Sequence, residues 1–253
     1  MIRSGVVAFA VAGFLLGACS SGDAIPEVEA TGPPAIRADV VANHAEQFDT
    51  DVPVRPAGSQ EELAAATYIS GHLQLAGYVV FLDGVPVRDL VRSTNVVARA
   101  PSGEAPRVVV LVPYDTSEEF ETDGSALGLF LELARALRVA RGGHDVSFIA
   151  LGAEHADIGK GNLGSRRAAQ GLLDDDHHPL VISLGWIADG VCGEIDGDLP
   201  GVAIPVEYSC DPLPETPNQP DVFAEAGFEH VTISGDPAVV GNILLDFLAS
   251  GSD

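Results

Sequence analysis

The chain has 253 residues, of which 46% are hydrophobic and 20% are charged, and its 37 acidic and 13 basic side chains give a formal charge of -24. A chain this apolar can bury enough surface to offset the entropy of ordering, so the composition excludes a disordered protein. Lys160 is the only lysine, and phosphate backbones are bound by clustered Lys and Arg, so no nucleic-acid partner is expected. We expect one packed core, because an α/β fold often uses about 250 residues for a single domain.

The first residues have the organisation of a bacterial export signal. A short basic start at residues 1–3 precedes an apolar run over residues 5–17, which is too short to span a bilayer as a mature helix. The run ends in Leu16-Gly17-Ala18-Cys19, which resembles the lipobox of bacterial lipoproteins, where the cysteine is acylated and becomes the first residue of the mature chain. An ordinary signal peptide with an incidental cysteine is the alternative.

This interpretation predicts a lipoprotein signal peptide over 1–18 and a lipidated tether over 19–35, rich in Ser, Gly, Pro and acidic residues. The protein would be exported and held by a lipid anchor at the cell membrane or the outer membrane, facing the periplasm or the exterior. With Cys19 assigned to lipid, Cys192 and Cys210 remain as a pair in an oxidising compartment, so we predict a disulfide between them. A cysteine-based metal site is not expected, because two cysteines without a nearby histidine pair do not make four ligands.

Hydrophobic periodicity and turn residues predict alternating helices and strands. The second predicted helix is the clearest, because Ser59-Gln60-Glu61-Glu62 is a capping box, in which the serine and the glutamate each bond the other's backbone N–H, and Gly77 ends the helix. The predicted helices cover residues 36–48, 59–77, 125–140, 165–173, 221–226 and 237–249. The predicted strands cover residues 78–82, 94–100, 107–112, 146–151, 180–187 and 230–234.

This alternation predicts an α/β fold, a three-layer α/β/α sandwich around a mostly parallel central sheet, as a single domain over 36–253. In such folds ligands bind at the carboxyl ends of the strands. Chemistry is therefore expected just after Val112, Leu151 and Ile187.

Two short motifs are given structural interpretations. The run 159–164 matches G-x-G-x-x-G, but seven residues separate it from the preceding strand, so we interpret it as a loop. The run 174–178, three aspartates and two histidines, is interpreted as a solvated turn, because consecutive residues on a loop rarely converge on one ion. Neither G-x-S-x-G nor H-E-x-x-H occurs in the sequence.

Five segments of the chain together point to one known family. They are Arg55-Pro56-Ala57-Gly58-Ser59, residues 93–99, residues 107–137, residues 146–150 with Ala153-Glu154, and Leu163-Gly164-Ser165-Arg166. These segments resemble the co-catalytic zinc aminopeptidases, metallopeptidase family 28. The resemblance covers residues 36–249 and implies the α/β/α fold of the aminopeptidases, which hydrolyse N-terminal peptide bonds. In that family five protein ligands hold two zinc ions, and a glutamate acts as general base on the bridging water.

The resemblance assigns the general base to Glu154 and the ligand-orienting aspartate to Asp115. Among the metal ligands, one falls on His155 and another near Glu121 or Asp123. The remaining ligand positions fall on residues without a metal-binding side chain, namely Pro113, Gly185 and Pro220.

Two main hypotheses follow. In the first, the protein is a membrane-anchored lipoprotein that has lost the two-zinc site, does not bind the zinc expected from the family, is catalytically inactive and acts by binding a peptide or a protein. In the second, it is an active metallo-aminopeptidase with rearranged ligands, namely His155, Glu121, Asp115 and one of His177, His178 or His230. A third possibility is a non-peptidase enzyme on the same scaffold. The acidic cluster could also bind one zinc, manganese or calcium ion, or its carboxylates could serve a helix N-terminus.

Overall fold

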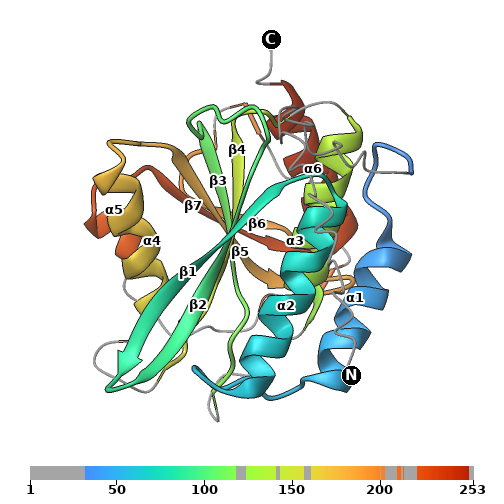
Figure 1. Ribbon diagram of the computed structural model, residues 1–253. Coiled ribbons are helices and arrows are strands. Elements are labelled where there is room, and N and C mark those ends of the chain that lie inside the picture. Colours follow the sequence, from blue (N-terminus) through green and yellow to red (C-terminus); the bar gives the residue numbers. More distant parts are fainter. Residues whose placement is uncertain are drawn as a thin grey trace, which may run out of the picture.

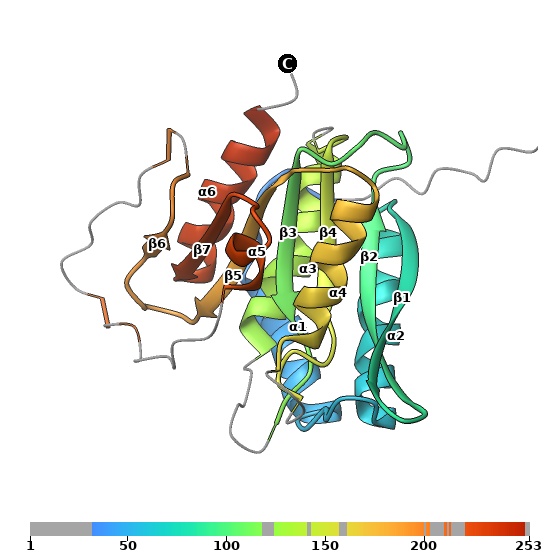
Figure 2. The same cartoon turned by 90° about the vertical axis from the view of Figure 1, so that its left-hand side faces the viewer.

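The computed structural model describes residues 32–117, 124–140, 143–156, 161–199, 201–202, 210–211, 213 and 221–250. One seven-stranded sheet lies at the centre, in the order β1-β2-β4-β3-β5-β7-β6. Helices cover both of its faces (Figure 1), and the view turned by 90° shows the same layers from the side (Figure 2). The predicted three-layer α/β/α sandwich is confirmed.

All the predicted helices and strands are present, and most of their ends lie within a few residues of the predicted ones. The strands are β1 (Val79–Arg88), β2 (Val91–Arg99), β3 (Val108–Pro113), β4 (Val146–Leu151), β5 (Leu180–Ile187), β6 (Glu194–Asp196) and β7 (His230–Gly235). The helices are α1 (Ala38–Asp51), α2 (Gln60–Leu75), α3 (Gly124–Val139), α4 (Leu163–Asp174), α5 (Val222–Glu225) and α6 (Pro237–Ser250). The sequence prediction missed β6, and it ended β1 too early.

The parallel strands form the middle of the sheet. β3 pairs in parallel with β4 and β5, and β5 pairs in parallel with β7. The apolar run of β3 from Val108 to Val112 is almost completely buried, as expected for a parallel strand that is covered on both faces. The hairpin of β1 and β2 adds antiparallel strands at one edge, and β6 adds one at the other.

The two faces carry separate hydrophobic cores. On one face α1, α2, α3 and α6 pack over a large cluster that includes Phe130, Leu133 and Phe148. On the other face α4 and α5 cover a smaller cluster that includes Leu111 and Phe223. This division follows from the connections, because α3 follows β3 on one face and α4 follows β4 on the other. In α/β sheets ligands bind beside such a switch point, at the carboxyl ends of the strands, and Asp115 and Glu154 follow β3 and β4 at that end.

The capping box at α2 forms in part. Ser59 accepts a hydrogen bond from the Glu62 N–H at 3.0 Å, as predicted. The Glu62 carboxylate does not return the bond, because the Ser59 N–H already donates to the carbonyl of Pro56 at 2.9 Å. Glu62 is buried, and its carboxylate accepts instead from Gly58 N at 2.5 Å and from more distant partners described below.

The structure describes the predicted disulfide, but only the last residues of the predicted tether. Cys192 and Cys210 form the predicted disulfide, with Cα atoms 5.0 Å apart. Cys19, the predicted signal peptide and residues 19–31 of the predicted tether lie outside the described residues. At the end of that tether, the carbonyls of Pro33 and Ala35 accept hydrogen bonds from Arg135 at 3.1 and 2.9 Å. Among the helices that the structure describes, none is long and apolar enough to cross a lipid bilayer.

Candidate functional site

Three of the predicted site residues come together at the carboxyl ends of β3 and β4. Asp115 is completely buried, and its two carboxylate oxygens accept hydrogen bonds from the backbone N–H groups of Glu154 and His155, both at 2.9 Å. The His155 ring nitrogen Nδ1 lies 3.1 Å from the Asp115 carbonyl oxygen and 3.4 Å from its carboxylate. Asp115 therefore fixes the loop that follows β4.

The Glu154 side chain turns toward α4. One carboxylate oxygen accepts from the Ser165 N–H at 2.9 Å, and the other accepts from the Ser165 hydroxyl. Ser165 is in the first turn of α4, whose N-cap residue Asn162 has a left-handed backbone (φ 53°) and makes no side-chain capping bond. Glu154 thus supplies the acceptor that a helix N-terminus needs.

A layer of buried polar side chains lies beneath this loop. Asn95 accepts from Gly152 N at 3.1 Å and donates to the Gly164 carbonyl at 2.9 Å. Glu62 accepts from Ala153 N at 3.2 Å and from the Ser93 hydroxyl. The packing is tight, because a Cβ atom added to Gly164 would lie 2.3 Å from the Gly152 carbonyl oxygen. The loop after β4 and the start of α4 are therefore held as one unit.

Arg55 holds the segment after β3. Its side chain is completely buried and donates to the carbonyls of Tyr114 at 2.7 Å and Val52 at 2.6 Å. Its guanidinium carbon lies 5.6 Å from the ring centre of Phe48. Burial lowers the pKa of Arg55, and the nearby carboxylates of Asp49 and Asp115 oppose this. The Arg-Pro-Ala-Gly-Ser block therefore positions Asp115.

The electrostatics of the cluster follow from burial and from the Asp115 charge. Burial raises the pKa of Glu154, and the hydrogen bonds from Ser165 reduce that rise. Burial likewise raises the pKa of Glu62. For His155 burial lowers the pKa, but the hydrogen bond and the charge of Asp115 outweigh burial and raise it. The cluster therefore favours a proton on His155 and disfavours a charge on the two glutamates.

The described chain covers only some of the other positions that the resemblance assigns to the metal site. Glu121, Asp123 and Pro220 lie outside the described residues. At Gly185 an added Cβ would lie 2.3 Å from the Ser234 hydroxyl oxygen, so a side chain there would have to displace that hydroxyl. In the part of the chain that the structure describes, no group of three or more His, Cys, Asp or Glu side chains could hold a metal ion.

The three histidines proposed as relocated ligands lie elsewhere. His177 and His178 precede β5, at the opposite end of the sheet from Asp115, and the His178 ring lies 5.8 Å from that of Phe228. His230 opens β7 and bonds to Ser183 and Asp221. Within the described residues none of the three lies beside Asp115 and His155, because His177 and His178 precede β5 and His230 begins β7, where it bonds Ser183 and Asp221.

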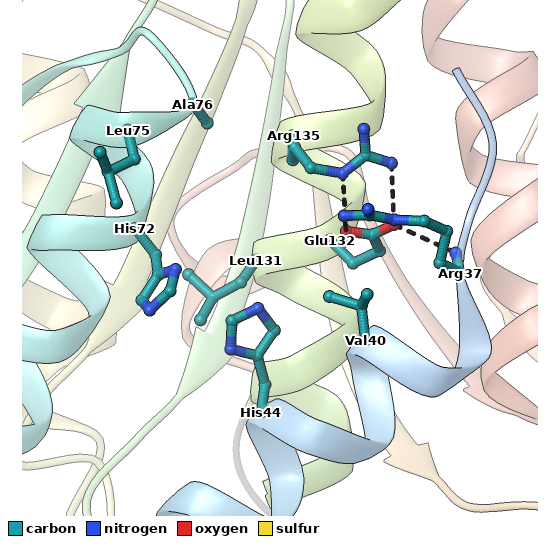
Figure 3. A pocket seen from close by; sticks show the side chains of 9 residues that line it. All are labelled: Arg37, Val40, His44, His72, Leu75, Ala76, Leu131, Glu132 and Arg135. Atoms are coloured by element: carbon teal, nitrogen blue, oxygen red, sulfur yellow. Dashed lines mark hydrogen bonds and ion pairs between the residues drawn. The ribbon is translucent and has the colours of Figure 1, made fainter. Parts of the chain in front are cut away.

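A cavity of about 270 Å³ lies between α1, α2 and α3 (Figure 3). Arg37 and Arg135 both bond the buried Glu132 carboxylate, at 2.8 Å through their Nε atoms. His44 and His72 face each other with ring centres 4.7 Å apart. Burial lowers the pKa of His44 to about 4, with the neighbouring His72 adding to the effect. Sequence reasoning missed this group, because its members come from three helices and form no motif.

Solved structures with the same fold include glutaminyl cyclases and zinc-dependent exopeptidases. Fimbriiglobus ruber glutaminyl cyclase aligns with a TM-score of 0.68 and 16% identity, covering 87% of this chain and 97% of that one. A leucine aminopeptidase precursor from Bacteroides thetaiotaomicron gives 0.65 and 15%, covering 86% and 98%. A putative zinc-dependent exopeptidase from Bacteroides vulgatus gives 0.65 and 16%, covering 87% and 99%.

No family model matches the chain, and no curated protein sequence matches it. At such low identities the structural likeness establishes the fold alone. The chain therefore has the mixed α/β fold found in zinc-dependent exopeptidases and glutaminyl cyclases.

Proposed function

We propose that this protein is an exported lipoprotein that keeps the zinc exopeptidase fold without two-zinc hydrolysis and acts by binding an extended peptide. The observation that carries the proposal is the position of the Glu154 carboxylate, which is bound by the backbone and the hydroxyl of Ser165. A general base must reach the proton that it abstracts. Here the residue at that position serves as a helix cap.

The donor atoms of the described residues do not fit a two-zinc centre. Zinc takes nitrogen, sulfur or carboxylate oxygen ligands, and Pro113 and Gly185 have none. At Gly185 a side chain would have to displace the Ser234 hydroxyl. The Asp115 carboxylate is occupied by two backbone N–H groups. We therefore assign no catalytic step to a metal in this protein.

The outermost strand β1 offers a binding surface for an extended peptide. It is ten residues long, and Val79, Phe81 and Leu82 are 45%, 52% and 62% exposed. Natural proteins usually protect such an edge by shortening it or by adding charge, because its unpaired N–H and C=O groups can pair with another strand. An added peptide strand would gain main-chain hydrogen bonds along β1.

A groove beside β1 would give such a peptide side-chain specificity. It encloses about 360 Å³ between β1, β2 and α4, and its apolar wall includes Phe81, Val97 and Ile149. Arg167 bonds Asp83 across it at 2.8 Å, and Arg99 bonds Asp175 at 3.3 Å. The groove thus presents apolar surface between charged pairs, which suits an apolar side chain of a strand lying on β1.

Membrane attachment rests on Cys19. The apolar run and the lipobox-like residues before it support export and acylation. A net charge of -24 disfavours electrostatic binding to anionic lipid, so a covalent anchor would be needed, and stable anchoring takes more than one acyl chain. If Cys19 is the anchor, Cys19→Ser will move the protein from the membrane fraction to the soluble fraction. Unchanged membrane association would contradict this part of the proposal.

Hydrolysis is tested by metal content and turnover. The mature chain is purified, dialysed and analysed for zinc, then assayed with aminoacyl p-nitroanilides and an N-terminal glutaminyl peptide in the presence of added zinc, cobalt or manganese. We expect no stoichiometric metal, no turnover and an unchanged melting temperature in chelator. Near-stoichiometric zinc with activity that Glu154→Gln abolishes would refute the proposal in favour of an active enzyme.

Binding is tested with a labelled decapeptide of alternating valine and threonine. We expect fluorescence polarisation to rise with protein concentration, and we expect Phe81→Lys or Leu82→Lys to abolish the rise. Leu90→Lys is the matched control, because Leu90 is 96% exposed and lies between β1 and β2. Equal loss in the control variant would show that β1 is not the binding surface.

A further inference from the structure

Ser183, His230 and Asp221 form a continuous hydrogen-bonded chain on the face of the sheet that α5 covers. The Ser183 hydroxyl oxygen lies 2.8 Å from His230 Nε2. His230 Nδ1 lies 2.6 Å from a carboxylate oxygen of Asp221. The three residues come from β5, β7 and the start of α5. This is the order of contacts that links a nucleophile, a base and the group that orients the base.

The partners determine the protonation of the neutral His230 ring. An ionised carboxylate only accepts, so the nitrogen facing Asp221 carries the hydrogen. The nitrogen facing Ser183 then has a free lone pair and accepts the hydroxyl hydrogen. His230 is therefore set to withdraw a proton from Ser183.

Each member of the chain is held in place by regular structure. β5 is paired on both sides, with β3 and with β7. The second carboxylate oxygen of Asp221 accepts from Phe223 N at 3.1 Å and Ala224 N at 2.9 Å at the N-terminus of α5. The Phe223 ring centre lies 5.8 Å from that of His230. Groups on paired strands hold their geometry better than groups on loops.

The side chains of the site are partly exposed. Ser183 is half-buried, and the side chains of His230 and Asp221 are 12% and 42% exposed. Its surroundings combine the aromatic ring of Phe223 with the negative charge of Asp221, in a protein of net charge -24. An uncharged substrate with a small acyl group suits these surroundings better than an anion.

We propose that Ser183 is an acyl-accepting nucleophile for small uncharged carboxylic esters, with His230 as its general base and Asp221 as the residue that positions His230. The Ser183 oxygen forms a bond to the acyl carbon while its proton passes to His230 Nε2. The bond from the acyl carbon to the alcohol oxygen then breaks, and His230 returns the proton to the leaving alcohol. Water repeats the sequence on the acyl-serine and releases the acid. No oxidant, reductant or metal takes part.

Turnover is expected to be slow. Ser183 lies within β5, whose backbone pairs with β3 and β7. The N–H groups of β5 therefore donate within the sheet rather than to an oxyanion. An enzyme gains a large part of its rate from preorganised donors to the oxyanion. Covalent labelling of the serine is therefore the more sensitive measurement.

The test treats the purified full-length protein with a fluorophosphonate probe, whose P–F bond is replaced by a bond to the serine oxygen as fluoride leaves. Peptide mapping by mass spectrometry is expected to locate the probe at Ser183, and p-nitrophenyl acetate hydrolysis is expected to be abolished in Ser183→Ala. His230→Gln keeps a hydrogen-bonding side chain but no base, so labelling should slow by about 100-fold or more. Asp221→Asn should slow labelling and shift its pH profile, because an amide can donate to the ring and reverse the tautomer.

Two controls separate chemistry from folding and from the proposed peptide-binding role. Ser234→Ala removes a serine of the neighbouring strand β7 that bonds Trp186 N, and it should label as the wild type does. Glu154→Gln should also leave labelling unchanged, whatever the outcome for metal or peptide. Circular dichroism and melting temperature verify that each variant is folded. Absence of the probe from Ser183 in folded protein, or equal labelling rates in His230→Gln, would overturn the proposal.

Discussion

The Glu154 carboxylate lies 2.9 Å from the Ser165 backbone nitrogen, and this hydrogen bond ties the loop after β4 to the first turn of α4. The same carboxylate accepts from the Ser165 hydroxyl. Glu154, which the resemblance assigns as general base, therefore caps α4. Its two hydrogen bonds should contribute to the stability of the fold.

Glu154→Ala should destabilise the protein by about 1.5–3 kcal/mol, because it removes the acceptor of two hydrogen bonds and leaves the start of α4 without its cap. Glu154→Gln should cost less, since an amide oxygen can still accept from the Ser165 N–H. Urea unfolding at pH 7 measures both. Glu61→Gln is the control, because Glu61 is exposed in α2. A loss in Glu154→Ala no larger than in the control would contradict the capping role.

Arg55→Met should destabilise the protein by roughly 3 kcal/mol or more, because the buried carbonyls of Tyr114 and Val52 lose their donor and Asp115 loses a nearby positive charge. Arg55→Lys should recover only part of this, since an ammonium lacks the planar fork of the guanidinium. Thermal melting ranks the variants, and Arg92→Lys on the exposed start of β2 is the reference. Full recovery with lysine would show that charge alone matters.

Local sequence patterns predict α2 well, and they fail where distant segments meet. The Ser59 cap depends on residues three apart and was predicted. The actual partners of Glu62 include Ser93 and Ala153, which are 31 and 91 positions away. β6 was missed because three residues carry no period of their own and depend on pairing with β7.

The candidate sites show the same limit. The family resemblance assigned Asp115, Glu154 and His155 to one site, and the structure brings them together after β3 and β4. Residue types could not predict that backbone N–H groups would occupy the carboxylates of Asp115 and Glu154. The contact between Ser183 and His230 spans 47 positions and depends on the register of β5 with β7. No sequence motif marks it, since Ser183 is not on a G-x-S-x-G turn.

Acidification should destabilise the protein through His44. Its pKa is about 4 in the folded protein against 6.5 for an unperturbed histidine, so the unfolded chain binds the proton more tightly. Stability from this residue is complete above pH 6.5 and is lost as the pH falls toward 4. Allowing for partial exposure, we expect a loss of about 1–2 kcal/mol over this range.

The comparison of His44→Gln with the wild type isolates this effect from other groups. Burial raises the pKa of Glu62 and Glu154, so their contributions change in the opposite direction. Unfolding free energies in urea at pH 7.5 and pH 5.0 should fall less in His44→Gln than in the wild type. His144→Gln, at an exposed position, should behave as the wild type. Equal pH dependence in all three proteins would show that His44 is not the cause.

Placing an aspartate at Gly185 should damage the fold rather than create a metal ligand. A Cβ atom there would lie 2.3 Å from the Ser234 hydroxyl oxygen and 2.9 Å from Thr232 Cγ2. We expect Gly185→Ala and Gly185→Asp to destabilise by about 1–3 kcal/mol, the usual cost of overpacking. Zinc content after dialysis should not increase in Gly185→Asp.

The clash can be assigned by a double-mutant cycle. Ser234→Ala removes the closest oxygen, so Gly185→Ala should cost less in that background, with a coupling energy of about 0.5 kcal/mol or more. Unfolding free energies of the two single variants and the double variant measure the coupling. Additive losses would show that Ser234 does not exclude the side chain. In that case the Thr232 methyl, or the backbone of β7, is the obstacle at this position.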